Sequence, residues 1–278
     1  MKNFGVIEGR RARDFVGGVL PYEVRNQSGN WTAWLPPGEW QKQLVDTMAC
    51  VTFSLLNCIE TQEYFLTGKQ INYSDRWIAM MSGTTPQGNY LGTVADTVRK
   101  YGLVKEESWP TPPNYTWASY YELPPQAKMA ELKAEGVEWL KTHQLDYEWL
   151  DTNPDTILKH LKHCPLQVVK PGHAIEGFYE DADVVNYFDS YSPFIKHIFA
   201  ENLTDVLKPI LTMKGQNMIA YKKLGDATIY IEVSGKLIPL ADWAAFVALG
   251  GSTDSIVELS ETQWAKFTKI NSVLFKSK

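Results

Sequence analysis

The sequence predicts an α+β fold, with helices in the first half of the chain, strands in the second half and a small α/β module at the end. Before residue 163, apolar residues recur at helical spacing in several segments. From residue 166, β-branched and aromatic residues gather in short strand-like segments. A turn signal at Leu224–Asp226 precedes a last stretch of mixed character. We therefore expect a main domain over residues 1–225 and an accessory module over residues 226–278.

Size and composition describe an ordinary globular protein. The chain has 278 residues, of which 44% are hydrophobic and 21% charged, and it can bury a core without disulfides. Its net charge of −5 gives no general reason to expect nucleic acid or an anionic membrane as a partner. The basic cluster Arg10–Arg13 is interpreted as a solvated segment. No apolar run approaches the ~20 residues of a membrane span.

The three cysteines are too few for a disulfide framework. Their odd number and the lack of a secretory signal favour a reducing compartment. A product released by cell lysis would look the same, so the localisation stays open, with the cytoplasm of a host or a virion as the expected places. We expect no cofactor and no metal site.

The first half is expected to contain five helices after a loop-rich start that extends to about residue 45. In the first of them Phe53, Leu56 and Ile59 fall near one face, and Gly102 is expected to end the third. The expected helices cover Cys50–Thr67, Arg76–Met81 with a cap at Ser74–Asp75, Leu91–Tyr101, Pro124–His143 and Pro154–His163.

Strands are expected over Leu166–Lys170, His173–Tyr179 and Val184–Phe188. The last two should form a hairpin, because Glu180–Asp183 has residues typical of a tight turn. In the accessory module, we expect a hairpin turning at Ser234–Lys236, then a capped helix, a strand and a short helix, with both tryptophans in the core. These last features lie at Asp242–Leu249, Ser255–Leu259, Glu261–Phe267, Trp243 and Trp264.

Cys50 is the strongest candidate for a reactive group. It stands where a polar loop becomes an apolar helical run, so its thiol should lie at the positive end of the helix dipole, which favours the thiolate. Cys58, well inside the same helix, and Cys164, just before a proline, fit inert packing instead.

His173 and Asp189 are the expected partners of Cys50. The predicted hairpin would bring Asp189 beside His173, and a buried carboxylate needs such a partner. Nucleophile, base and orienting carboxylate then occur in the order Cys, His, Asp. The other four histidines are less promising, since three lie in charged helical stretches and are expected to be solvated, and the fourth follows a lysine near a strand end. They are His143, His160, His163 and His197.

Several segments of the chain resemble, in the same order, those of the papain-like cysteine peptidases. The nucleophile segment, the start of the second helix, the glycine loop, the strand before the histidine, the histidine segment and the orienting segment all have counterparts. They are Cys50–Ser54, Asn72–Asp75, Gly88–Tyr90, Cys164–Val168, His173–Ile175 and Asp189–Tyr191. The resemblance covers roughly residues 15–200. Within the family, the chain is most similar to bacteriophage and uncultured-bacterial members.

The resemblance implies a two-lobed fold, with a helical N-terminal lobe and an antiparallel β C-terminal lobe. It also implies a cysteine endopeptidase in which His173 holds Cys50 as a thiolate, Asp189 orients His173, and a thioester forms. The Cys50 N–H and either Gln41 or Gln43 would bind the oxyanion, and the backbone at Gly88 and Asn89 would pair with a peptide or protein substrate. No inhibitory pro-segment is recognisable, so the chain is expected to start near the mature boundary.

Departures from the family pattern leave alternatives open. The family has Asn where this chain has Asp189, Gln where it has Leu44, and Trp where it has Val51 and Tyr191. A thiol-type peptidoglycan hydrolase of a phage and a transglutaminase-like acyl transferase use the same three residue types, although the separation of Cys50 and His173 fits the papain-like family better. A decayed virion or structural component is the non-enzymatic alternative. Residues 226–278 are expected to attach to a virion or cell-surface partner.

Overall fold

The computed structural model describes residues 5–7, 9, 24–214, 220–225, 228–233, 236–240, 256–265 and 268–269. These fall into two compact units, which we describe separately. The first consists of Met1–Leu140 and Gln144–Thr212, and the second of Lys141–His143 and Met213–Lys278. The Arg10–Arg13 cluster, the expected helix at 242–249 with Trp243, and the turn residues 234–235 lie outside the described residues.

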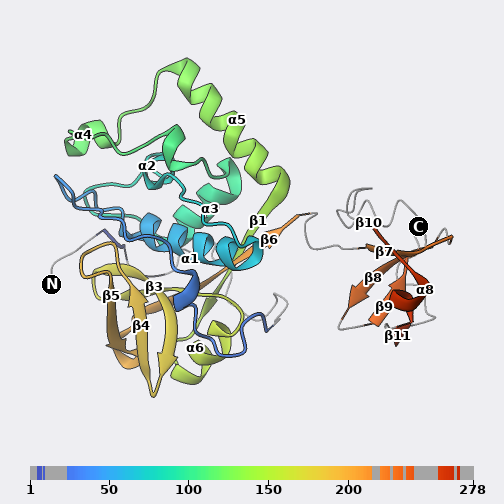
Figure 1. Ribbon diagram of the computed structural model, residues 1–278. Helices are drawn as coiled ribbons and strands as arrows, with labels where there is room; N and C mark the ends of the chain where they lie inside the picture. Colours follow the sequence, from blue (N-terminus) through green and yellow to red (C-terminus); the bar gives the residue numbers. More distant parts are fainter. Residues whose placement is uncertain are drawn as a thin grey trace. The chain divides into compact units, whose positions relative to one another are not determined.

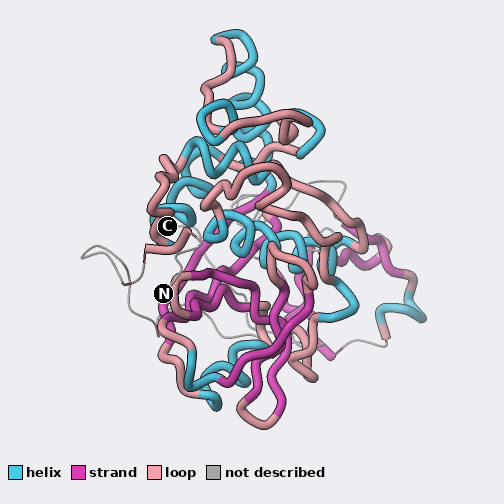
Figure 2. Tube along the Cα trace, turned by 90° about the vertical axis from the view of Figure 1, so that its left-hand side faces the viewer, coloured by secondary structure: helices cyan, strands magenta, loops and turns pink. Residues whose placement is uncertain are grey.

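The first unit has two lobes on either side of a central helix, α1 (Cys50–Thr67). Helix α1 packs against α2 and α3 on one side and against β2 and β3 on the other (Figure 1). Figure 2 shows the trace from the side, with helices in cyan and strands in magenta. Because both sides of α1 are covered, every residue from Cys50 to Glu63 is buried. Its first residue thus lies where the two lobes meet.

The helical lobe follows the expected elements closely. Ser74 caps the second helix by accepting a hydrogen bond from Trp77 N, and Gly102, in the left-handed region, ends the third. The fourth expected helix is slightly shorter than predicted, and a short capped helix precedes it. The helices are α2 (Asp75–Met81), α3 (Leu91–Tyr101), α4 (Trp117–Tyr120) and α5 (Gln126–Thr142), with 3-10 turns η1 (Thr32–Trp34) and η2 (Glu106–Ser108).

The second lobe is a six-stranded sheet with the order β1-β6-β2-β3-β4-β5. The predicted hairpin is present: Asp181 pairs with Val184, and Ala182 and Asp183 both have positive φ, as a two-residue hairpin turn requires. Three strands were not predicted: the two edge strands β1 and β5, and β6, which lies between β1 and β2. The elements are β1 (His143–Leu150), α6 (Pro154–Leu161), β2 (Leu166–Lys170), β3 (His173–Asp181), β4 (Val184–Phe188), β5 (Ile195–Phe199), η3 (Ala200–Asn202) and β6 (Asp205–Met213).

Trp31, in the loop-rich start of the chain, packs in the core of the β lobe. Its ring is fully buried, its Nε1–H donates to Leu161 O at 2.6 Å, and its backbone N–H donates to Phe178 O. Burial of a tryptophan with its polar atom satisfied is strongly stabilising. The chain from Trp31 to Cys50 is therefore anchored at both ends, which fixes the loop that leads to α1.

The second unit contains a five-stranded sheet with the order β10-β7-β8-β9-β11. The predicted pair β8–β9 is antiparallel, whereas β10 and β11 add parallel strands. The strand β7, just before the expected joint at Leu224–Asp226, belongs to this sheet, and Trp264 is in its core. The domain boundary at residue 225 stays a prediction. The elements are β7 (Ala220–Lys223), β8 (Ile229–Val233), β9 (Lys236–Pro239), β10 (Ile256–Leu259), α8 (Glu261–Trp264) and β11 (Thr268–Lys269).

Among the described residues, no helix combines the length and the apolar character needed to cross a bilayer. In the same part of the chain, no group of three or more His, Cys, Asp or Glu side chains is arranged to hold a metal ion.

Candidate active site

Cys50 is the first residue of α1, as the sequence predicts. The helix has no side-chain cap at this end, because Ala49 occupies the capping position. The N–H groups of the first helical turn have no intrahelical acceptor, so they can donate to a negatively charged atom there. Met48, two residues earlier, adopts φ +57°, a strained value for a side chain with a β-carbon. The chain thus enters α1 through a sharp, unusual turn.

The sulfur of Cys50 lies against the start of strand β3. The backbone N–H of Ala174 donates to Cys50 Sγ at 3.4 Å. Ala174 directly follows His173, and the β2–β3 hairpin fixes both because Lys170 pairs with His173. Residues that are 124 positions apart in the sequence therefore meet.

His173 is bonded to Asp189, also as predicted. Asp189 Oδ1 and His173 Nε2 are 2.7 Å apart, and both side chains are almost completely buried. With Nε2 engaged by Asp189, Nδ1 is the ring nitrogen that would exchange a proton with the thiol. The ring of Tyr191 packs edge-on against that of His173, with centroids 5.3 Å apart. Tyr191 thus covers the imidazole.

Two lysines that the sequence analysis did not single out complete the surroundings of Asp189. Lys196 Nζ lies 2.8 Å from Asp189 Oδ2, and Lys170 Nζ lies 3.9 Å from the same atom. Lys196 was missed because β5, which carries it, was not predicted. Lys170 could have been found, since a two-residue turn at Pro171–Gly172 places it opposite His173. Asp189 therefore faces three basic side chains.

The charge state of Cys50 differs from the expected thiolate. Burial raises the pKa of the Cys50 thiol to about 12; the Ala174 N–H acts to lower it, and the charges of Asp189 and Asp46 raise it further. Cys50 is 0% exposed, so desolvation outweighs the helix dipole. The expectation of a lowered thiol pKa is wrong for this closed arrangement, in which Cys50 is a neutral thiol.

His173 and Asp189 shift in the direction that suits a neutral thiol. The pKa of His173 is lowered, mainly by burial, although the hydrogen bond and charge of Asp189 oppose this. For Asp189, burial acts to raise the pKa, but the hydrogen bonds and charges of His173 and Lys196 outweigh it and leave the pKa below its ordinary value. Around neutral pH the site therefore contains a thiol, a neutral imidazole and a carboxylate.

Of the two glutamines expected to bind the oxyanion, the structure brings Gln41 to the site. Gln41 is buried, its Oε1 accepts from Ser190 Oγ at 2.8 Å, and its Nε2 donates to Asp46 and to the Tyr191 hydroxyl. Gln43 is exposed. Both amide hydrogens of Gln41 are engaged, so binding an oxyanion requires it to release one of them. In this structure, Gln41 holds the segment after Asp189 in place through its hydrogen bonds with Ser190 and Tyr191.

The loop expected to bind substrate pairs with the chain's own N-terminal segment. Gly5 O accepts from Asn89 N at 3.0 Å, and Ile7 N donates to Asn89 O at 2.8 Å. A β-carbon on Gly88 would lie 2.0 Å from Gly5 O, and one on Gly5 would lie 2.1 Å from Met48 O. Residues 5–7 therefore lie between the loop before Cys50 and the loop at Gly88. The side chain of Asn89 points inward and bonds Ser82 and Thr84.

The remaining histidines and cysteines are largely structural. His143 and His163 are buried instead of solvated, because His143 starts a strand and His163 follows the end of α6. Cys58 and Cys164 are fully buried, as expected, and burial raises the pKa of each. Periodicity alone did not reveal the burial of the two histidines.

A helical lobe and an antiparallel β lobe, with a cysteine at the central helix and a histidine on the facing strand, define the papain-like two-lobed α+β fold. Solved structures agree. The chain resembles the Amb a 11 cysteine protease, a major ragweed pollen allergen, in its proform (TM-score 0.51, 15% identity, 65% of each chain covered). It also resembles a digestive procathepsin L 3 of the Tenebrio molitor larval midgut (TM-score 0.51, 13% identity, 74% of this chain and 76% of that chain covered).

Xylellain, a cysteine protease from Xylella fastidiosa, gives a TM-score of 0.50 at 13% identity over 76% of this chain and 96% of its own. The chain spans 65% of the length of the ragweed proform. No protein-family model matches the chain, and no curated protein matches it in sequence. At these identities the solved structures establish the fold.

Proposed function

We propose that the protein is a cysteine endopeptidase that cleaves a peptide or protein substrate through Cys50, His173 and Asp189. One observation carries the proposal: Ala174 N lies 3.4 Å from Cys50 Sγ, while the adjacent His173 is bonded at 2.7 Å to Asp189. The start of α1 supplies the nucleophile, and the β3–β4 hairpin with the segment after it supplies the base and the orienting acid. The papain-like fold supports the same reaction class.

The neutral thiol determines how the first step runs. His173 takes the thiol proton on Nδ1 as the sulfur attacks the substrate carbonyl, so thiolate and imidazolium form only during attack. Asp189 stabilises the imidazolium, and the N–H of Cys50 binds the oxyanion. His173 then passes the proton to the departing amine. A water molecule, deprotonated by His173, attacks the thioester and releases the acid and the thiol.

A second candidate is a protein that keeps this fold but no longer hydrolyses substrate. The complete burial of Cys50, together with its raised pKa, favours this alternative in the closed arrangement. Reaction of Cys50 with an epoxide thiol trap would separate the two candidates. An origin in a phage, peptidoglycan as the substrate and attachment of residues 226–278 to a virion or cell surface stay predictions.

The test compares Cys50→Ala with Cys58→Ala. Both substitutions remove a buried thiol from α1, but the Cys50 sulfur contacts Ala174 next to His173, whereas Cys58 lies two turns further along the helix. A broad peptide library is digested and the products are identified by mass spectrometry. We expect Cys50→Ala to abolish cleavage and Cys58→Ala to retain it. Cleavage by the Cys50→Ala protein would show that Cys50 is not the nucleophile.

A further inference from the structure

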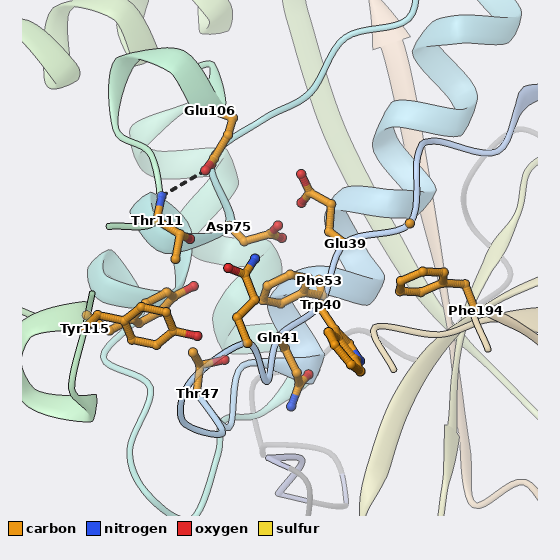
Figure 3. A pocket seen from close by; sticks show the side chains of 13 residues that line it. Glu39, Trp40, Gln41, Thr47, Phe53, Asp75, Glu106, Thr111, Tyr115 and Phe194 are labelled. Carbon is orange, nitrogen blue, oxygen red and sulfur yellow. Dashed lines mark hydrogen bonds between the residues drawn. The ribbon is translucent and has the colours of Figure 1, made fainter. Parts of the chain in front are cut away.

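A cavity of about 390 Å³ lies beside the proposed active site in the first unit. Gln41 and Thr47 form part of its wall, and Gln41 also contacts Ser190 and Tyr191 next to Asp189. Phe53, one turn after Cys50 in α1, forms another part. Figure 3 shows these side chains around the cavity. An occupant of the cavity would therefore lie next to a substrate at Cys50.

Three carboxyl groups line this cavity: Glu39, Asp75 and Glu106. Asp75 is 5% exposed, and its Oδ1 has no hydrogen-bond partner among the described residues. Asp75 also shares a hydrogen bond with Glu39, but a negative charge on the buried Oδ1 is costly without a donor, so a donor or cation in the cavity would stabilise it. The other two are partly satisfied, since Glu39 accepts from Asn72 Nδ2 at 2.6 Å and Glu106 accepts from Thr111 N at 2.9 Å.

The described part of the chain provides no ion-pair partner for these acids. Arg76 is adjacent in sequence, but its guanidinium donates to three backbone carbonyls and stacks on the ring of Trp109 at 4.3 Å. It reduces the negative charge near Glu106 without bonding the carboxylate. Even with Arg76 counted, three ionised carboxylates would leave the pocket negative.

Burial favours the protonated form of two of these carboxyl groups, Asp75 and Glu106. Burial, followed by the charge of Glu39 and the hydrogen bond with it, raises the pKa of Asp75 well above its ordinary value. Burial likewise raises the pKa of Glu106 to about 7. A positive group that entered the cavity would replace these protons and release them to solvent.

The walls indicate what kind of cation fits. Trp40, Tyr115 and Phe194 line the cavity together with the acids, so aromatic surface surrounds the charged groups. Such walls suit an aliphatic stem that ends in an ammonium or guanidinium group. Among the described residues no cluster of three or more His, Cys, Asp or Glu side chains is arranged to hold a metal ion, and it is the aromatic walls that favour an organic cation.

We propose that this pocket binds a cationic group of the substrate, an ammonium or guanidinium on an aliphatic stem, next to the cleaved bond. The proposal rests on the peptidase function proposed above. Either a basic side chain or the α-ammonium of a peptide would present the same chemistry, and the test distinguishes the two sources.

The test measures binding to the Cys50→Ala protein, so it does not depend on cleavage. Isothermal titration calorimetry compares N-acetyl-lysine methylamide, its neutral norleucine analogue and norleucine methylamide with a free α-amine. We expect one cationic probe to bind about tenfold more tightly than N-acetyl-norleucine methylamide, since charge-assisted bonds are the strong ones. Tighter binding of the lysine probe would identify a basic side chain as the bound group, and tighter binding of the free amine would identify a peptide α-ammonium. Equal binding of all three would overturn the proposal.

Neighbouring glutamates provide a matched pair of variants. Glu106→Gln removes a charge from the pocket and keeps an oxygen for Thr111 N, whereas Glu107→Gln removes an exposed charge that pairs with Lys105 outside it. Glu106→Gln should reduce the preference for the cation severalfold, and Glu107→Gln should leave it unchanged. Asp75→Asn should act like Glu106→Gln. An equal effect of Glu106→Gln and Glu107→Gln would refute the site. If the protein binds the cationic probe but cleaves no peptide, only the proposed function is disproved.

Discussion

At the scale of single residues, Cys50, His173 and Asp189 show how burial changes the expected chemistry. The sequence indicated which residues meet, because the hairpin and the helix start were both readable. It could not indicate that all three would be almost completely buried. Desolvation then raises the pKa of the thiol and lowers that of the imidazole, against the helix dipole. The base therefore has to remove a proton during attack.

The pH dependence of activity tests this assignment. Because His173 must be neutral to accept the thiol proton, activity should rise with pH through the pKa of His173, which lies below its ordinary value of 6.5. Asp189→Asn removes a charge that raises this pKa, so the acid limb should move to lower pH. Lys196→Gln removes a charge that lowers it, so the limb should move to higher pH. Each shift should be roughly 0.5–1 unit.

These shifts are measured from profiles of kcat/KM against pH and, independently, by NMR titration of His173. Glu131→Gln, which changes an exposed charge on α5, serves as the control and should leave the limb in place. If the acid limbs of Asp189→Asn and Lys196→Gln moved in the same direction, the charge assignment around His173 would be contradicted.

At the scale of elements, the helices were predicted more accurately than the sheet. Helices α1, α2 and α3 begin or end at residues with local signals, such as Ser74 and Gly102. The strands β1, β5 and β6 have no comparable signal, since every residue of β5 is exposed or half-buried and β6 contains Pro209. Their place depends on pairing with distant partners. Lys196 was missed for the same reason.

A close contact between α3 and α5 gives a prediction for this scale. A β-carbon on Gly136, in the middle of α5, would lie 2.0 Å from Tyr101 O. Alanine is favoured over glycine inside a helix by about 1 kcal/mol, but backbone atoms cannot move aside. Gly136→Ala should therefore lower the free energy of unfolding, by about 1–3 kcal/mol as for other overpacked sites. Urea unfolding measures the change.

The matched control for this contact is Ala134→Gly, on an exposed turn of the same helix. It should cost about 1 kcal/mol, from helix propensity alone. A more stable Gly136→Ala protein would show that α3 and α5 can separate without cost.

At the scale of the whole molecule, the first unit buries several acidic side chains in its interior. Glu176 on β3 is 0% exposed and accepts from Thr61 Oγ1 at 2.8 Å. Burial raises its pKa to about 8. The folded protein thus keeps a proton that the unfolded chain releases above its ordinary pKa of 4.5. Stability from this group is full at low pH and is lost as the pH rises toward 8.

Glu176→Gln should remove this dependence, because the amide keeps the acceptor for Thr61 and carries no proton to lose. At pH 8 we expect the variant to be more stable than the native protein by up to about 4 kcal/mol, at about 1.4 kcal/mol per pH unit. Chemical unfolding at pH 5 and at pH 8 measures the difference. A change of equal size at both pH values would show that Glu176 is ionised throughout.

The pairing of Gly5–Ile7 with Asn89 has a consequence for any assay of the protein. A peptide that binds the backbone of Asn89 competes with residues 5–7 of the same chain. Because these residues are covalently attached, their local concentration does not fall on dilution. Short tethers commonly correspond to millimolar effective concentrations. Weak ligands would then go undetected until residues 5–7 are displaced, and a peptide that seems inert at micromolar concentration has not been shown to be a poor substrate.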